Sequence, residues 1–135
     1  MPLRHHPKIG DVLMCAFPEC LREPEMIKTR PVVVVTKEHR GRPALCTVVP
    51  LSTTRPDPIL DFHVRIDERG LPRILSHRET WAKCDMLYTL CLDRLDRIRC
   101  GKDAATGRRL YETGRIAVDE LAKVRRAVAF ALGLS

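Results

Sequence analysis

The stretch Pro31-Val32-Val33-Val34-Val35-Thr36 decides the fold of this chain. Valine is β-branched, so four valines in succession restrict their own rotamers and favour an extended backbone. No polar residue alternates with them, and this pattern predicts a strand that is buried on both of its faces. The stretch is therefore expected to lie inside the core of a β-rich fold.

Outward from the valines, short apolar runs alternate with turn residues. Further candidate strands are Val12–Phe17, Ala44–Leu51, Phe62–Ile66, Trp81–Met86, Tyr88–Leu92 and Arg109–Ile116. The segments without apolar periodicity are expected to be loops or turns: 18–30, 37–43, 52–58 and the basic segment 99–109.

One segment, from Val118 to Leu132, has the period of a helix. Its apolar residues recur at close to a 3.6-residue spacing, at Val118, Leu121, Val124, Val128 and Leu132. Acidic residues in its first turn and Gly133 after its end are typical of helix termini. Many short strands with one C-terminal helix predict a mainly β fold, in which a small bent sheet or barrel carries the helix on one side.

The length and charge of the chain limit its class and its partners. Its 135 residues fit one domain, 1–135, with a single modest core. The formal net charge is +7 and the sequence pI is about 9.4. A small domain this basic attracts polyanions, so RNA, DNA or an acidic protein tail are natural partners; the alternative is that the charge serves solubility alone.

No stretch of the sequence is typical of export or of a membrane. The N-terminal segment MPLRHHPKIGD has charge and proline with no apolar run behind it. The longest apolar stretches, Pro31–Val35 and Ala127–Leu132, are far shorter than a membrane span. The six cysteines are expected to be free thiols in a reducing compartment. We therefore expect a cytoplasmic protein.

Neither a metal site nor a cofactor site is predicted. The pairs Cys15/Cys20 and Cys84/Cys91 lack the close spacing of a zinc site, and His5-His6 is expected to be solvated. The acidic residues are scattered, whereas a metal-dependent nuclease needs clustered carboxylates. A phosphate-binding glycine loop is also missing. A Cys–His or Ser–His–Asp hydrolase is formally possible, but no serine has the flanking glycines of a nucleophile elbow.

An arginine and several hydroxyl side chains stand at strand ends. Arg30 immediately precedes the valine strand, and Ser52, Thr53 and Thr54 follow the strand that ends at Leu51. If these two strands lie side by side, a guanidinium and a hydroxyl meet at one rim of the sheet. A forked guanidinium is a good phosphate ligand, and a hydroxyl can donate to a phosphate oxygen. The alternative is a solvated arginine beside a turn-forming Ser-Thr-Thr.

Several short motifs follow one another along the chain. They are Gly10-Asp11 with its strand, Arg30-Pro31 with the valines, Val49-Pro50-Leu51-Ser52-Thr53, Trp81–Met86 with Thr89-Leu90, and the helix ending in Leu-Gly-Leu. Their order resembles the MazF/PemK toxins of bacterial toxin–antitoxin pairs, and the resemblance covers Ile9 to Leu134. The resemblance implies a small SH3-like barrel with a C-terminal helix, the fold that MazF and CcdB toxins share.

The resemblance also implies an activity. Members of the family are homodimers that bind single-stranded RNA in a groove across the dimer and cut it without a metal or another cofactor. The ribose 2′-hydroxyl attacks, leaving a 2′,3′-cyclic phosphate and a 5′-hydroxyl. The family's catalytic arginine corresponds to Arg30 and its catalytic threonine to Ser52; we predict that Lys28, Thr53 and Arg55 bind RNA.

Two departures from the family pattern accompany this match. Serine at position 52 keeps the hydroxyl of threonine and loses the methyl group that restricts its rotamer. Residues 18–29 lack the family's Gly-Ser-Glu-Gln run, in the loop that helps to form the RNA groove. The cleaved RNA sequence therefore does not follow from the family.

The resemblance implies a cognate antitoxin with a disordered acidic segment as a partner. We expect this segment to lie over Arg30 and the Pro18–Thr29 loop, and to exclude RNA by competition. Two alternatives are a CcdB-like poison of DNA gyrase with no catalysis, and a degenerate member that binds RNA without cutting it. Arg30 and Ser52 together favour the nuclease.

Overall fold

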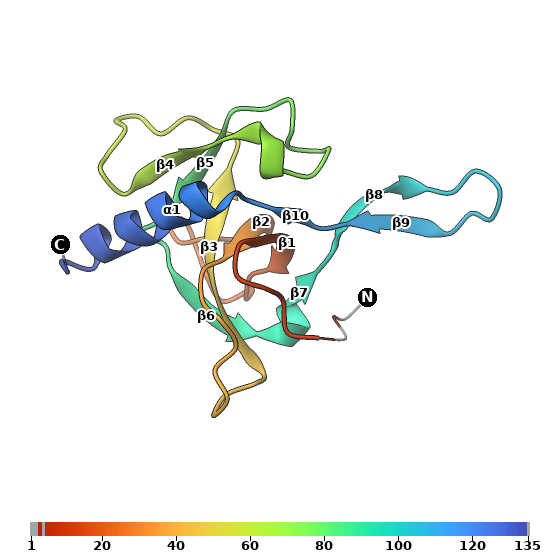
Figure 1. Cartoon of the computed structure of the whole chain (residues 1–135), viewed down its shortest axis with the longest axis horizontal. Coiled ribbons are helices and arrows are strands. Elements are labelled where there is room, and N and C mark those ends of the chain that lie inside the picture. The colour runs from red at the N-terminus through yellow and green to blue at the C-terminus, as the bar shows by residue number, and fades with distance from the viewer. Residues whose placement is uncertain (1–2, 4, 135) are drawn as a thin grey trace.

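The computed structural model describes residue 3 and residues 5–134. Figure 1 shows a bent sheet with one helix across it and a two-stranded hairpin that projects from the other side. The strands are β1 (Asp11–Ala16), β2 (Thr29–Val34), β3 (Leu45–Ser52), β4 (His63–Ile66), β5 (Thr80–Lys83), β6 (Tyr88–Cys91), β7 (Leu95–Asp96), β8 (Ile98–Lys102), β9 (Arg109–Glu112) and β10 (Gly114–Arg115). The helix is α1 (Val118–Ala131), and two short 3₁₀ helices lie at Glu68–Gly70 and Leu92–Arg94. The predicted mainly β fold with one C-terminal helix is confirmed.

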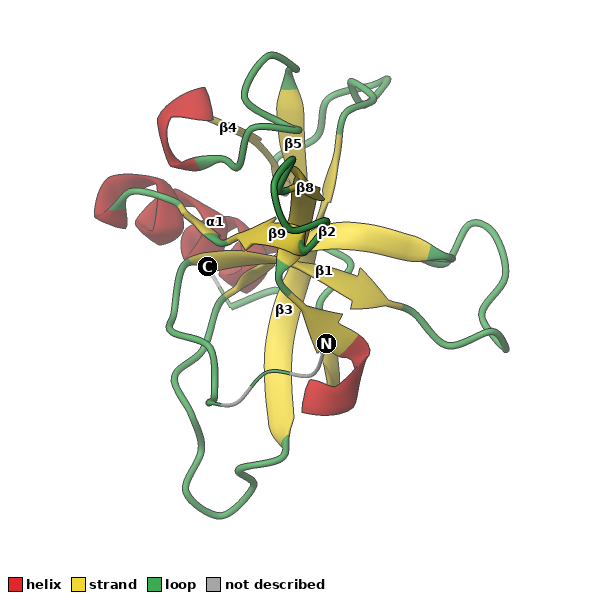
Figure 2. Ribbon diagram, turned by 90° about the vertical axis from the view of Figure 1, so that its right-hand side faces the viewer, coloured by secondary structure: helices red, strands yellow, loops and turns green. Residues whose placement is uncertain are grey.

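The main sheet is antiparallel and strongly twisted. Its order is β10-β1-β2-β3-β5-β4, while β6 also pairs with β3 and β7 with β1. In Figure 2 the long strand β3 crosses the direction of β1, which shows how far the sheet bends. Within the described residues, β10 and β4 end the path without pairing to each other, so the sheet is not closed into a barrel.

The valine half of β2 is buried on both faces, as the sequence predicts. Val32, Val33 and Val34 are each fully buried. Because side chains alternate across a strand, Val33 packs in the core beneath α1, whereas Val32 and Val34 pack in a second core on the opposite face. β2 is thus the central layer between two apolar clusters.

The second core holds the loop between β1 and β2 in place. Phe17 donates its backbone N–H to the Lys28 carbonyl (3.0 Å), which closes the loop. Met26 is buried in this core and donates its backbone N–H to the Tyr88 hydroxyl (3.2 Å). The Phe17 and Tyr88 rings meet edge to face at 5.1 Å. The predicted loop therefore has a fixed path, although it ends two residues early because β2 already begins at Thr29.

The predicted helix is confirmed, with its apolar face on the sheet. Val124 and Ala127 are buried against the core, and the helix ends where Gly133 takes a positive φ of 76°. Leu134 donates its N–H to the Ala129 carbonyl at 2.8 Å, which is a common way to close the last helical turn. Among the described residues, no helix is both long and apolar enough to cross a membrane.

The prediction of a loop at 99–109 is wrong at both ends: β8 and β9 form a hairpin, and only residues 103–108 are its loop. The register pairs Ile98 with Glu112 and Arg99 with Tyr111, and a bulge follows Arg99. Most residues of these strands are charged or exposed, so no apolar alternation marks them. The predicted strand 109–116 is accordingly divided between β9 and β10.

Gly70 lies where the chain after β4 passes against β10, and we expect Gly70→Ala to destabilise the fold. A Cβ on Gly70 would lie against the Arg115 carbonyl oxygen and 2.7 Å from Ile116 Cα, both backbone atoms that cannot rotate away. We expect the free energy of unfolding to fall by about 1–3 kcal/mol in urea denaturation. Gly41→Ala is the control, since its Cβ meets only the mobile end of His39 at 3.5 Å. Equal stability of the two variants would contradict the close approach.

Candidate active site

The two rim residues that the sequence singles out end on neighbouring strands. β2 and β3 pair antiparallel, with Val32 opposite Pro50 and Val33 opposite Val49. Continuing this register by two residues sets Arg30 opposite Ser52. Since alternate residues point to one face of a sheet, both side chains leave the sheet on the same side. The strands therefore lie side by side as the sequence argument required.

Arg30 and Ser52 line one open groove of about 700 Å³ at this rim. Residues 23–27 of the loop between β1 and β2 (residues 17–28, the anchored loop) line one part of it. Ile74, Leu75 and Arg78, which precede β5, line another part. The end of β3 and the following turn, residues 51–54, form the floor together with the start of β2. The groove is therefore lined mainly by three segments that are distant in sequence, 23–31, 51–54 and 74–78.

The Arg30 side chain is held by one hydrogen bond at Nε, and the rest of its guanidinium is accessible to a ligand. Its Nε donates to the Ile27 carbonyl at 3.2 Å, and the residue is exposed. Within the described part of the chain, no carboxylate lies at ion-pair distance from it. The guanidinium can therefore bind an anion in the groove.

The Ser52 hydroxyl is oriented by the turn that follows it. Its Oγ accepts a hydrogen bond from the Thr54 backbone N–H at 3.1 Å. A hydroxyl that already accepts one hydrogen bond still has its own proton to donate. Thr53 and Thr54 line the groove beside it. The rim therefore offers one fixed cation and one hydroxyl donor, the pair that suits a phosphate oxygen.

Two further cations, Arg78 and Lys83, line the same groove and were missed by the sequence argument. Lys83 ends β5, which pairs with β3 by setting Ala82 opposite Leu51. The position of Arg78 is fixed by Thr80, whose fully buried hydroxyl donates to the Arg78 carbonyl at 3.2 Å. Only the pairing of β3 with β5 reveals these residues, because nothing in the local sequence connects them to the rim.

The structure does not bring the other two predicted RNA-binding residues to the groove. Lys28 ends the anchored loop with a positive φ of 66°, and Arg55 lies beyond the turn in an ion pair with Glu79. Neither residue lines the groove, whereas Thr53 does. RNA binding by Lys28 and Arg55 stays a prediction.

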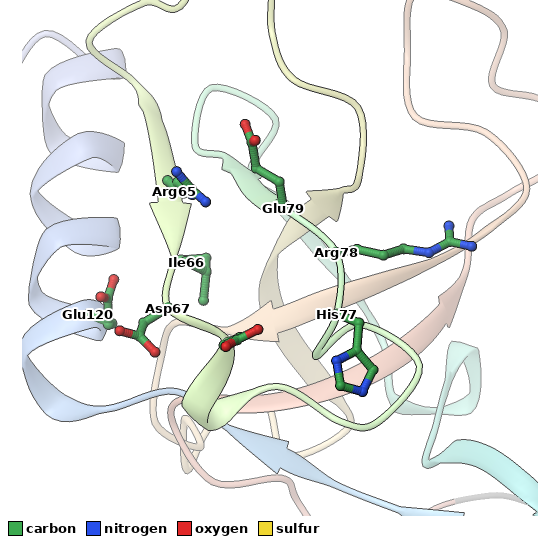
Figure 3. Close-up of a pocket in the computed structure, with 8 residues that line it drawn as sticks. Arg65, Ile66, Asp67, His77, Arg78, Glu79 and Glu120 are labelled. Atoms are coloured by element: carbon green, nitrogen blue, oxygen red, sulfur yellow. The ribbon is translucent and has the colours of Figure 1, made fainter.

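A second cavity of about 500 Å³ lies beside the groove and shares Arg78 with it. Figure 3 shows the carboxylates of Asp67 and Glu120 on one side, with Arg78 extending away from them. Glu120 is 7 % exposed, and its Oε2 has no hydrogen-bond partner within the described residues. Among those residues, no three His, Cys, Asp or Glu side chains are grouped to hold a metal ion.

The buried cysteines are poor candidates for a nucleophile. Burial raises the pKa of Cys15 to about 12, of Cys46 to about 11 and of Cys84 to about 12. The reactive species of cysteine is the thiolate, which is scarce near neutral pH at these values. The Cys–His hydrolase that the residue inventory allows is therefore not supported at these three positions.

Glu79 fixes the entrance to β5 and should stay charged in acid. Arg55 donates to it through Nε (2.7 Å) and Nη2 (3.0 Å), and Trp81 donates through Nε1 (2.7 Å). The Arg55 hydrogen bonds, then that of Trp81, lower the pKa of Glu79 to about 2. A lowered folded-state pKa adds stability that is complete above the ordinary value of 4.5 and is lost as the pH falls toward 2.

We expect a carboxyl NMR titration of Glu79 to show a midpoint near pH 2. Arg55→Ala should move this midpoint upward, whereas Arg73→Ala, which removes an arginine outside this network, should not. The fluorescence of Trp81, the only tryptophan, should also report the protonation of Glu79, because Trp81 donates a hydrogen bond to this carboxylate. A midpoint near the ordinary value in both proteins would show that the network does not form.

Comparison with known proteins gives the family. A sequence profile of the PemK-like, MazF-like toxins of type II toxin–antitoxin systems matches residues 8–132. The chain belongs to this toxin family. The uncharacterized protein YifN of Escherichia coli (strain K12) is 32 % identical to this MazF-like chain over 118 residues, covering 73 % of the chain and 78 % of YifN.

Solved structures of MazF-like proteins share the fold. An endoribonuclease in complex with its cognate antitoxin, from a mycobacterial species, aligns with a TM-score of 0.62 at 24 % identity, covering 96 % of this chain and 98 % of that one. MazF from Deinococcus radiodurans aligns with a TM-score of 0.62 at 20 % identity, covering 94 % and 96 %. At these identities the likeness establishes the fold of the MazF-like chain, and the chemistry must be argued from its own residues.

Proposed function

We propose that this MazF-like chain is the toxin of a type II pair and an endoribonuclease that cuts single-stranded RNA, such as mRNA, in the cytoplasm. The observation that carries the proposal is that Arg30 and Ser52 line one open groove together with two further cations, Arg78 and Lys83. The mycobacterial relative named above is an endoribonuclease with the same fold, which supports the assignment.

In the proposed reaction, the ribose 2′-oxygen forms a bond to the adjacent phosphorus and the bond from phosphorus to the 5′-oxygen breaks. The products are a 2′,3′-cyclic phosphate and a 5′-hydroxyl; the 2′-hydroxyl loses its proton to water, and the leaving 5′-oxygen takes a proton from water. Arginine is not deprotonated in proteins, so Arg30 does not act as the base. It stabilises the negative charge that builds on the phosphorane, while Ser52 donates to a non-bridging oxygen.

Alignment supplies much of the proposed rate, because the 2′-hydroxyl is already tethered beside the phosphate that it attacks. This chemistry needs no metal to generate the nucleophile. Arg78 and Lys83 extend the cationic surface on the same groove, where they can hold the phosphates on either side of the cut. We further propose that the active unit is a homodimer whose two copies share the RNA groove.

We also propose control by a cognate antitoxin. The structure of the mycobacterial relative is a complex of that kind. An acidic segment that folds over Arg30 and the anchored loop would occupy the place of RNA, so that binding of the two is exclusive. Charge attraction should make this association fast and sensitive to salt.

The test is to incubate the purified protein with RNA of mixed sequence in excess EDTA. We expect cleavage with 5′-hydroxyl ends, and cleavage about 10²–10³-fold slower from Arg30→Ala purified in parallel, which controls for contaminating nuclease. Loss of cutting in EDTA would require a metal-dependent reaction. Binding of RNA with no cutting under any condition would instead identify a non-catalytic member of the family.

A further inference from the structure

A second cationic cavity lies at the base of the β8–β9 hairpin, away from the rim. Arg94, Arg97, Arg99 and Arg109 line this space of about 660 Å³ together with Tyr111. Two carboxylates also line it, so the guanidinium groups are in excess. In Figure 1 the hairpin projects from the sheet on the side opposite the free end of α1.

The hairpin register gathers the polar side chains of this cavity on one face. Arg99 is paired with Tyr111, and Arg109 stands two residues before Tyr111 on the same strand. Alternation along β9 therefore points Arg109 and Tyr111 to the same side. The bulge after Arg99 includes Gly101, whose φ of 120° is accessible to glycine and rarely to other residues.

An aromatic ring and a guanidinium are already stacked in this cavity. The Arg97 guanidinium carbon lies 4.7 Å from the centre of the Tyr111 ring. Both planar groups are surfaces on which RNA bases stack in single-stranded complexes. Within the described part of the chain, neither Arg99 nor Arg109 forms an ion pair, so both guanidinium groups can bind phosphate.

The hairpin cavity adjoins the Arg30–Ser52 groove, because Met14 lines both spaces. The β1–β2 register places Met14 opposite Pro31, which lines the groove, and Ala16 opposite Thr29, which lines the hairpin cavity. An RNA strand that occupies the groove can therefore reach the hairpin cavity over Met14.

We propose that the hairpin cavity is a second RNA subsite, which holds a phosphate and a stacked base of the strand that flanks the cleaved bond. This inference rests on the proposed function. Arginine forks with a stacking ring match a nucleotide better than they match an acidic peptide, which supplies carboxylates and no base. The subsite adds affinity for long RNA and takes no part in bond breaking.

The test measures binding of 2′-O-methyl oligonucleotides, which cannot undergo 2′-hydroxyl attack, by fluorescence anisotropy. Oligonucleotides of about 4 and about 12 nucleotides span the usual range of single-strand sites. We expect Arg99→Ala/Arg109→Ala to raise the Kd of the long one about tenfold or more and leave that of the short one unchanged. The slope of log Kd against log salt should fall by about 1.4, the loss of two phosphate contacts.

Tyr111→Leu should also raise the Kd of the long oligonucleotide about tenfold, with an unchanged salt slope, because stacking carries no charge. The matched control is Arg40→Ala/Arg42→Ala, which removes two exposed arginines from the turn between β2 and β3. All of these side chains lie outside the apolar cores, so the thermal unfolding of the variants should match that of the native protein.

Unchanged binding of the long oligonucleotide by Arg99→Ala/Arg109→Ala would overturn the subsite, even if the protein cuts RNA. If that variant instead lost affinity only for a poly-glutamate peptide, the cavity would belong to a protein partner and the proposal would also fail. If the expected losses appear in a protein that never cuts RNA, the subsite holds and the proposed function is wrong.

Discussion

Arg30→Ala is expected to lower the rate of RNA cleavage by about 10²–10³-fold, the usual cost of removing one donor that stabilises transition-state charge. Arg30 lines the same groove as Ser52, and within the described part of the chain its guanidinium forms no ion pair. The fold should survive, because the side chain is exposed and joins neither apolar core.

The measurement is a single-turnover cleavage assay, with circular dichroism to confirm that Arg30→Ala is folded. Arg40→Ala is the matched control, since it removes the same charge from an exposed turn. Cleavage by Arg30→Ala at the native rate would move the site elsewhere. Arg78 and Lys83 would then be the first residues to replace, because they line the same groove.

Ser52→Ala is expected to have the second largest effect, a loss of about 10–100-fold in cleavage rate. One hydrogen bond to a charged group contributes about 1.5–3 kcal/mol, which is less than a charge donor at the same rim. The loss should appear in kcat rather than in KM, because the hydroxyl is proposed to act on the oxygen that gains charge during the reaction.

Ser52→Thr keeps the hydroxyl and adds the methyl group of the family's catalytic threonine, so it tests the effect of that methyl group alone. We expect this variant to cut at least as fast as the native protein, since the added methyl restricts the rotamer of a hydroxyl that is retained. Ser76→Ala is the control, because the Ser76 hydroxyl donates to the Arg73 carbonyl outside the groove. A Ser52→Ala protein with native kcat would remove Ser52 from the mechanism.

The central strand and the helix were predictable because each has a strong local signal. Four successive β-branched valines strongly favour a strand, and the spacing from Val118 to Leu132 has the period of a helix. Even the placement of Arg30 and Ser52 at one groove follows from strand order, if β2 and β3 are neighbours. The local sequence pattern is therefore sufficient to predict an element that is fully buried, and to predict the pairing of two strands that follow each other in the chain.

The remaining features depend on pairing over long distances. Lys83 reaches the groove because β5 pairs with the end of β3, and no local pattern encodes that contact. The sequence predicts a loop where β8 and β9 form, because exposed, charged strands have no apolar alternation. Sheet closure is also a property of the whole strand order, so a barrel and an open bent sheet have the same local pattern.

The most direct test of the central claim compares two RNA oligonucleotides in excess EDTA. One contains a mapped cleavage site, and the other differs by a single 2′-deoxy sugar before the scissile phosphate. We predict that the native protein cuts the first to a 2′,3′-cyclic phosphate and a 5′-hydroxyl, and leaves the second intact at that bond. Cleavage of the deoxy-substituted strand, or a 5′-phosphate on the product, would contradict attack by the 2′-hydroxyl at the Arg30–Ser52 rim.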